Sequence, residues 1–273
     1  MTGPRLTVLV VGATGSVGRF AVKEAIKQGH YVRALTRSSP NARLLPQEAQ
    51  VFIGDLTVPE TLTGAVENVD AIVFTHSSDT GGKFGTEFVD YGGVRNVLDL
   101  LGSRNVRIAF MSCIGVTNRT CGDYNMNEGR DWKRRSERLI RARGLPYTIV
   151  RPGWFDYNGP KEHRLVFLQG DACQVGGPSD GVIAREQVAE VLVRSLVSRH
   201  AQSKTFELVA SYGMALGDLD ASFRSLKADV PGAVDGVHDA PNMQLEREPK
   251  RVRDDIESAR RRRLLSITFA RGA

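Results

Sequence analysis

The sequence predicts an α/β fold, a doubly wound parallel sheet of the Rossmann type with a small C-terminal substrate lobe. The first observation is the run Leu6 to Val11 (LTVLVV), which is apolar throughout, as in a strand buried on both faces. The second is that such runs alternate with amphipathic stretches as far as Gly153. This β-α-β alternation is typical of parallel strands joined by right-handed helical crossovers.

The elements follow from apolar spacing and from the Gly and Pro residues that interrupt it. Gly29 ends the first helix, and Pro152-Gly153 ends the sixth strand. We expect strands at 6–11, 31–37, 50–53, 71–75, 107–111, 147–151 and 205–209, and helices at 16–28, 59–66, 87–101, 127–143 and 185–197. Gly92-Gly93 inside one helix indicates either close packing against the sheet or a ligand, or local loss of helix.

Three regions are expected along the chain. Residues 1–153 form the dinucleotide-binding domain, and residues 154–240 form the substrate lobe, interleaved with the last sheet elements. Its segments 154–184 and 211–240 are rich in Gly, Pro and Asp, which favours loops. Residues 241–273 form a charged tail with a terminal helix near 254–265.

Composition excludes several classes of protein. With 41% hydrophobic and 25% charged residues in 273, the chain is typical of soluble globular proteins. No run of about 18 apolar residues predicts a membrane span. No signal-peptide pattern precedes the first strand, so we expect a cytoplasmic protein. Three scattered cysteines and no CxxC pair argue against a disulfide framework and against a metal site.

The basic character is partly local. The net charge is +6, and the run Arg260 to Arg263 supplies four of the positive charges. No aromatic residues are interleaved with these arginines, as a base-stacking surface would require. We therefore expect a solvated tail and no nucleic-acid partner.

A glycine-rich turn directly follows the first strand and opens the first helix. In that position Gly12 permits a tight turn, Gly15 lets the backbone approach a diphosphate, and Gly18 lets the helix pack closely on the strand. The amide groups at the helix start favour a bound phosphate. The predicted cofactor-binding residues here are Gly12, Thr14, Gly15, Ser16, Val17 and Gly18.

The end of the second strand indicates which nicotinamide cofactor is bound. NAD-binding proteins usually carry Asp or Glu there, whereas this chain has Arg37 followed by Ser38-Ser39. A guanidinium can pair with a 2′-phosphate through two hydrogen bonds, so NADP(H) is preferred and NAD(H) stays open. Arg33 either shares the face of Arg37 or is a solvated edge residue.

Polar residues end the next two strands as well. Asp55 in Gly54-Asp55-Leu56 can accept a hydrogen bond from adenine while Leu56 packs on the ring; the alternative is a turn or cap carboxylate. Thr75, His76 and Ser77 end the fourth strand and so face the crevice where such sheets bind ligands.

These motifs together resemble the atypical short-chain dehydrogenase/reductases, in the NAD(P)-binding branch near the NmrA-like proteins. The matching segments are 12–18, 54–56, Tyr91-Gly92-Gly93-Val94-Arg95-Asn96 and Tyr147-Thr148-Ile149-Val150-Arg151-Pro152-Gly153. The resemblance implies that Ser112 orients a substrate oxygen. It also implies that Lys133 holds the nicotinamide ribose and supports proton transfer.

The sequence departs from that family at the tyrosine of the YxxxK pair. Gly129 stands four residues before Lys133. Tyr124 and Tyr157 are the candidates to replace the missing side chain, and the alternative for each is a packing or hydrogen-bonding role. Cys113, next to Ser112, is either a small buried hydrophobe or a reactive thiol.

Hydride transfer needs no protein base, since the cofactor carries that chemistry. We therefore expect an NADP-dependent oxidoreductase, monomeric or homodimeric, that acts on a small carbonyl, quinone, flavin or enone. The alternative is a non-catalytic NAD(P)-binding redox sensor or regulator.

Overall fold

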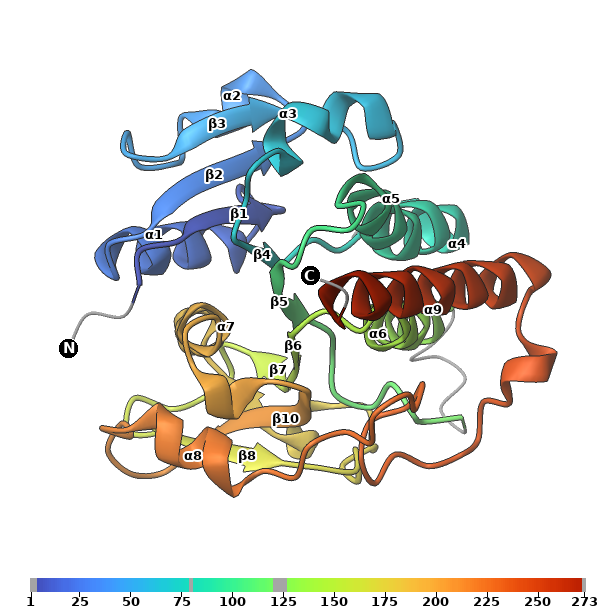
Figure 1. Ribbon diagram of the computed structural model, residues 1–273. Helices are drawn as coiled ribbons and strands as arrows, with labels where there is room; N and C mark the ends of the chain where they lie inside the picture. The colour runs from blue at the N-terminus through green and yellow to red at the C-terminus, as the bar shows by residue number, and fades with distance from the viewer. Residues whose placement is uncertain (1–3, 79–80, 120–126, 272–273) are drawn as a thin grey trace.

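The computed structural model describes residues 4–78, 81–119 and 127–271, with side chains as far as residue 264, and within them ten strands form a single sheet (Figure 1). The strand order is β3-β2-β1-β4-β5-β6-β10-β9-β7, with β8 paired to β10. The first seven strands of this order are parallel, and β8 and β9 run antiparallel to β10. The predicted doubly wound, mostly parallel sheet is confirmed.

The predicted strands are all present, within one or two residues at their ends. Three further strands lie between residues 154 and 184, where the hydrophobic pattern predicts none. The strands are β1 (Thr7–Val11), β2 (Tyr31–Thr36), β3 (Gln50–Ile53), β4 (Ala71–Phe74), β5 (Arg107–Met111), β6 (Tyr147–Pro152), β7 (Trp154–Phe155), β8 (Arg164–Leu168), β9 (Val182–Ile183) and β10 (Lys204–Ser211).

The helices cover both faces of the sheet. They are α1 (Gly18–Lys27), α2 (Ser39–Ala42), α3 (Thr63–Val66), α4 (Gly82–Gly85), α5 (Gly92–Leu100), α6 (Gly129–Arg143), α7 (Arg185–Ser195), α8 (Leu219–Ser225) and α9 (Lys250–Arg271). Single 3₁₀ turns occur at Pro59–Leu62, Pro178–Asp180, Arg199–Ala201 and Leu245–Arg247. The expected helix at 87–101 is a π-helix, Thr86–Tyr91, followed by α5. No helix in the described ranges is both long and apolar enough to cross a membrane.

Two cores result from the alternation of side chains along the strands. In β1, Val8 and Val10 point into the core beneath α1 and α7, whereas Leu9 and Val11 point into the core beneath α5 and α6. All four side chains are fully buried, which explains the continuous apolar run. Figure 1 shows the two helical layers on opposite sides of the sheet.

The glycine pair in the predicted long helix packs closely against a neighbouring loop. A Cβ atom on Gly93 would lie 3.0 Å from the Cβ of Leu56. One helical turn later, the Asn96 side-chain amide donates a 2.7 Å hydrogen bond to the main-chain carbonyl of Leu56. The start of α5 therefore fixes the loop that follows β3.

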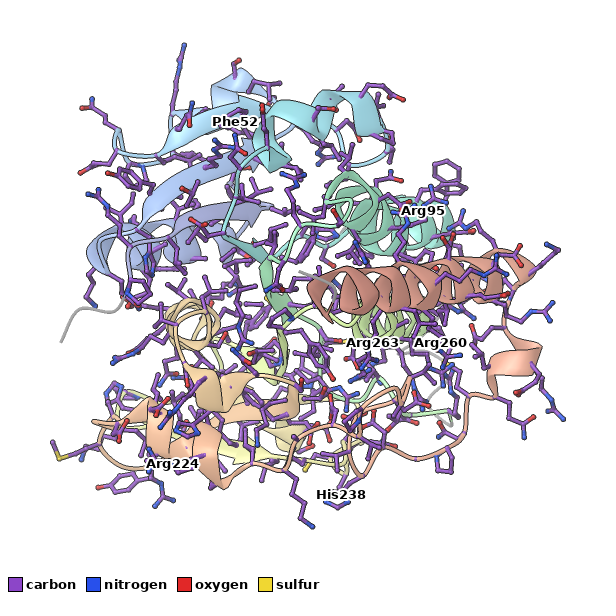
Figure 2. All side chains as sticks on the ribbon, viewed as in Figure 1. Phe52, Arg95, Arg224, His238, Arg260 and Arg263 are labelled. Carbon is purple, nitrogen blue, oxygen red and sulfur yellow. The ribbon has the colours of Figure 1, made fainter. Side chains whose placement is uncertain are left out.

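The C-terminal residues form helix α9, which packs on the domain through one apolar stripe, while Arg260 and Arg261 of the arginine run are exposed, as expected. Val252, Ile256 and Ala259 of α9 are buried in the core that contains α6. Arg260 and Arg263 project from α9 (Figure 2). A Cβ atom on Gly144, at the end of α6, would collide with the side chain of Arg263.

Buried ion pairs tie the segment before α9 to α6. Arg134, Arg138 and Arg141 are spaced to share one face of α6, and all three are buried. Their partners in this segment include Asp235, 2.8 Å from Arg138 Nε through Oδ1, and Asp229, 3.2 Å from Arg141 Nε through Oδ2. Buried guanidinium groups require such partners, so residues 229–248 hold the helix that carries Lys133.

Candidate functional site

A cavity of about 1100 Å³ opens at the carboxyl ends of the parallel strands. It lies where the strand order reverses between β1 and β4, the place where open α/β sheets bind ligands. Its lining includes Gly12, Thr14, Gly15, Ser16, Leu35, Thr36, Arg37, Asn41, Asp55, Leu56, Thr75, His76, Asp90, Met111, Ser112, Cys113, Gly129, Arg130, Lys133, Pro152, Gly153, Trp154, Phe155 and Arg185. This volume is slightly above the range of about 300–1000 Å³ typical of small-molecule sites.

The glycine loop is shaped by contacts that leave no space for side chains. Gly12 has φ +82°, and a Cβ atom there would lie 2.8 Å from the main chain of His76. A Cβ on Gly18 would lie 2.0 Å from the carbonyl oxygen of Gly12. The Thr75 hydroxyl, which donates to the carbonyl of Val11 at 2.9 Å, holds the loop from β4.

The predicted loop residues divide into two groups. Gly12, Thr14, Gly15 and Ser16 line the cavity, as expected. Val17 is buried in the core and Gly18 packs on Gly12, so the structure does not bring either of them into the cavity lining.

The end of β2 presents a cation and no carboxylate to the cavity. Arg37 lines the wall with Asn41, next to Thr36, whose hydroxyl lies 3.3 Å from that of Thr14. Neither Ser38 nor Ser39 belongs to the lining.

Arg33 does not line the cavity as Arg37 does. Its Nη1 donates to the main-chain carbonyls of Ala65, at 3.2 Å, and Glu67. These carbonyls lie at the end of α3, so Arg33 caps that helix.

Asp55 forms the turn contacts of one interpretation, and its hydrogen bond to adenine stays a prediction. Its Oδ1 accepts hydrogen bonds from the Thr57 amide, at 2.8 Å, and the Thr57 hydroxyl, at 2.7 Å. These bonds, with the positive charge of Arg37, lower the pKa of Asp55. Asp55 is thus a turn carboxylate that also lines the cavity beside Leu56.

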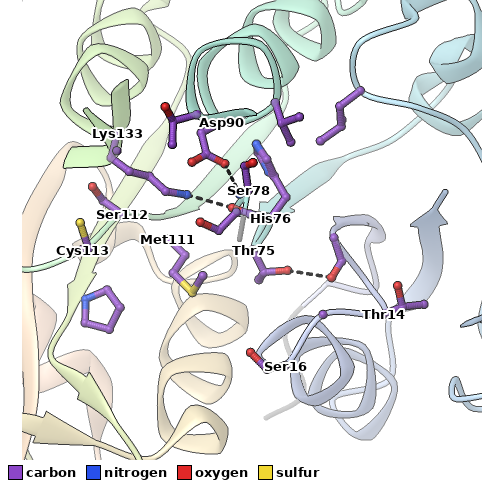
Figure 3. Close-up of a pocket in the computed structure, with 18 of the residues that line it drawn as sticks. Thr14, Ser16, Thr75, His76, Ser78, Asp90, Met111, Ser112, Cys113 and Lys133 are labelled. Carbon is purple, nitrogen blue, oxygen red and sulfur yellow. Dashed lines mark hydrogen bonds between the residues drawn. The ribbon is translucent and has the colours of Figure 1, made fainter. Parts of the chain in front are cut away.

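Lys133 links α6 to the end of β4. Its Nζ donates a 2.9 Å hydrogen bond to the main-chain carbonyl of His76, and both residues line the cavity (Figure 3). Burial, and then the charge of Lys133, lowers the pKa of His76 to about 3. The imidazole is therefore neutral at physiological pH and supplies no proton there.

Asp90 is a buried carboxylate in the same region that sequence reasoning missed. It lies on the π-helix, and its Oδ1 accepts a 2.7 Å hydrogen bond from the Ser78 amide (Figure 3). The π-helical turn brings Thr86, Val89 and Asp90 to the cavity wall. A π-turn inside a longer helix often marks a functional site, but the sequence signal for it is only the glycine pair that follows.

Ser112 and Cys113 end β5 at the cavity wall, as predicted. Ser112 is buried, and its amide donates to the carbonyl of Val150 at 2.8 Å. Burial raises the pKa of the Cys113 thiol to about 11. Since only the thiolate is nucleophilic, this raised pKa favours the interpretation of Cys113 as a small hydrophobe.

No tyrosine belongs to the cavity lining formed by the described residues. Tyr157 is 65% exposed and lies outside the lining, so it is not the substitute for the missing tyrosine. Tyr124 falls outside the described residues. Gly129 does line the cavity, one helical turn before Lys133, and leaves that part of the wall open.

A family model described as NAD(P)H-binding matches residues 12–199, which include the glycine loop, Ser112 and Lys133. The chain belongs to this NAD(P)H-binding family. The expected relationship to the atypical short-chain dehydrogenase/reductases is thereby confirmed, and the cofactor is a nicotinamide dinucleotide.

Relatives within and near the NAD(P)H-binding family carry different names. Sanguinarine reductase of Eschscholzia californica is 27% identical over 268 residues, covering 83% of this chain and 96% of that protein. The photosystem II assembly factor Ycf39 of Synechocystis is 27% identical over 210 residues, covering 76% of this chain and 63% of that protein. The solved structure of the oxidoreductase ylbE from Lactococcus lactis has a TM-score of 0.64 at 16% identity, covering 81% of this chain and 96% of that one.

The cavity brings together the cofactor loop, Ser112 and Lys133, with Gly129 where the resemblance in the sequence would place a tyrosine. Beyond Lys133 the wall is built by residues that sequence reasoning missed. Trp154 and Phe155 follow the Pro-Gly pair that ends β6, a strand end that could have been examined. Arg185 comes from the start of α7, and nothing in the sequence marks it as a site residue.

Proposed function

We propose that this chain is an NADP-dependent reductase that delivers hydride from NADPH to a small planar acceptor, such as a quinone, flavin, enone or carbonyl compound. One observation carries the proposal. A single cavity contains the glycine loop at one end and, beyond Lys133, an open region lined by Trp154 and Phe155. A cofactor and an acceptor therefore have room in the same enclosure.

The preference for NADP(H) is supported by Arg37. It lines the cavity at the end of β2, where no carboxylate is present to accept from a ribose 2′-hydroxyl. Thr14 and Asn41, close to Arg37 along the wall, add polar groups. A guanidinium at this position favours the additional phosphate of NADP(H).

The roles of the chain's own residues follow from their positions. The amides of the loop from Gly12 to Ser16 would hold the diphosphate, and Lys133 would hold the nicotinamide ribose and keep positive charge at the reacting end. The bound cofactor supplies the hydride. With Gly129 in place of tyrosine, the proton that completes the reduction would come from water, which suits acceptors that form a stabilised anion.

The test is to mix the protein with NADPH and a panel of quinones, flavins, enones and aldehydes and to follow the absorbance of the reduced cofactor. We expect acceptor-dependent oxidation that follows saturation kinetics. Cofactor oxidation no faster than in protein-free controls across the panel would contradict the proposal. The choice of panel is supported by the name of one relative, sanguinarine reductase, which aligns with this chain over 96% of its length.

The second candidate is a non-catalytic sensor of the NADP(H) redox state. Gly129 at the tyrosine position favours it, and so does a relative named as an assembly factor. It requires a partner protein that associates with only one redox state of the complex. Identical partners with NADP⁺ and NADPH in affinity purification would contradict it. A cytoplasmic location and a monomeric or homodimeric state stay predictions.

A further inference from the structure

The end of the cavity beyond Lys133 gathers positive charge. Three cationic side chains, those of Arg130, Lys133 and Arg185, line this end, together with one carboxylate, that of Asp90. Arg130 and Lys133 are buried, with 4% and 6% of their surface exposed. Because buried charges are screened less than exposed ones, the two act strongly on any charged group that enters.

Flat surfaces accompany these charges. Trp154 and Phe155 line the same end, and Gly129 leaves part of its wall without a side chain. A Cβ atom on Gly129 would make only an ordinary 3.5 Å contact with Thr86, so the space there is open. A planar ring system can therefore lie against this wall.

Arg185 is held in place but keeps hydrogen-bonding capacity. Its guanidinium carbon lies 4.8 Å from the centroid of the Phe155 ring. Nη1 pairs with Asp156, whose side chain is 53% exposed. The Nε atom has no hydrogen-bond partner among the described residues.

We infer that the acceptor reduced at this site is a planar anion, with its ring against Trp154 and Phe155 and its carboxylate, phosphate or sulfonate group bound by Arg185. This inference rests on the proposed function and deepens it. Arg185 would be the specificity-determining residue, since a guanidinium donates charge-assisted hydrogen bonds to such groups. Arg130 and Lys133 add attraction without needing to touch the anion.

The test compares riboflavin with FMN, two probes that share one ring system and differ only in a phosphate. Their binding to the protein saturated with NADP⁺ is measured by calorimetry, which requires no turnover. We expect FMN to bind at least about tenfold more tightly than riboflavin, as a charge-assisted hydrogen bond provides. Arg185→Gln should bring the two affinities together, and Arg185→Lys should restore part of the difference.

The matched control is Arg194→Gln. Arg194 lies on the same helix, pairs with Glu190 on the surface, and is outside the cavity lining. Equal binding of FMN and riboflavin by the unmodified protein would overturn the inference, as would equal losses in Arg185→Gln and Arg194→Gln. Failure of the proposed function can be told apart from failure of this inference. If FMN binds more tightly than riboflavin but is not reduced by NADPH, only the reductase activity is contradicted. If both flavins are reduced and bind with equal affinity, only the selection by charge is contradicted.

Discussion

Lys133 Nζ donates a 2.9 Å hydrogen bond to the main-chain carbonyl oxygen of His76, which joins helix α6 to the strand end that supports the glycine loop. The lysine and the loop lie on sequence segments more than 110 residues apart, and this contact sets them in one cavity. The same contact keeps a neutral imidazole beside a buried cation. The position of Lys133 in the cavity thus depends on the end of β4, which also supports the glycine loop.

Lys133→Met removes the positive charge and leaves the carbonyl of His76 without this donor. We expect kcat/KM for NADPH-dependent reduction to fall by about 10²-fold or more, the usual scale for loss of a group that supports proton transfer and binding. Steady-state kinetics measure it. Lys250→Met on the exposed side of α9 is the control, and comparable activity of the two variants would contradict the role of Lys133.

Substitutions at Gly15 and Gly18 should have different effects, the first on cofactor binding and the second on stability. Gly15→Val places methyl groups where the diphosphate must lie and should abolish cofactor binding in a protein that still folds. Gly18→Ala forces a Cβ atom to within 2.0 Å of the Gly12 carbonyl oxygen and should lower the free energy of unfolding, by about 2 kcal/mol or more.

Calorimetry with NADPH and denaturant unfolding separate the two effects. Gly177→Val is the control, because its backbone is extended and nothing lies within 4 Å of a Cβ atom there. Unchanged NADPH affinity in Gly15→Val would show that the loop does not bind the diphosphate.

Gly129→Tyr tests how the open wall is used. The new phenol would stand one turn before Lys133, on the same helix face, and would enter the cavity. We expect KM for a large planar acceptor such as FMN to rise by about tenfold or more through steric exclusion, with a smaller change for NADPH. Gly129→Ala should retain activity. Unimpaired FMN reduction by the tyrosine variant would show that acceptors bind elsewhere.

Glu207 makes stability depend on pH. Arg151 is shared among Glu137, Glu207 and Asp239, so one guanidinium serves three buried carboxylates. Burial, together with the nearby charge of Asp171, raises the pKa of Glu207 from 4.5 to about 7. The folded protein therefore holds this proton more tightly than the unfolded chain, and stability is lost as the pH rises through that interval.

Glu207→Gln should remove this contribution. Between about pH 5 and pH 8, the unfolding free energy of the unmodified protein should fall by about 2 to 3 kcal/mol relative to that of the variant. Urea denaturation at several pH values gives the difference. Parallel pH profiles for the two proteins would contradict the shifted pKa.

The fold could be predicted because its signals are local and repeated. Each central strand is buried on both faces, so its apolar run is continuous, and the glycine loop marks the first crossover. Strands β7 to β9 could not be predicted from local patterns. β7 and β9 are two residues long and pair with each other, and β8 and β9 pair with β10, which follows later in the chain. The packing of α9 was missed because arginine-rich helices usually face water, whereas here one apolar stripe contacts α6.

The cofactor end of the site was more predictable than the acceptor end. Gly12, Gly15, Arg37 and Lys133 occupy places that the topology fixes relative to strand ends. Arg185 reaches the cavity from α7, and no pattern in the sequence states which side of the molecule the start of that helix faces. The spacing of Arg134, Arg138 and Arg141 in the sequence predicts that they share one face of α6. Their acidic partners follow about 90 to 110 residues later.

The most direct measurement is a calorimetric titration of the unmodified protein and of Arg37→Glu with NADPH and with NADH. We expect saturable binding of both cofactors to the unmodified protein, tighter for NADPH, and a loss of NADPH affinity in the variant that far exceeds any loss for NADH. No saturable binding of either cofactor at millimolar concentration would contradict the central claim. Equal losses for both would show that Arg37 does not bind the 2′-phosphate.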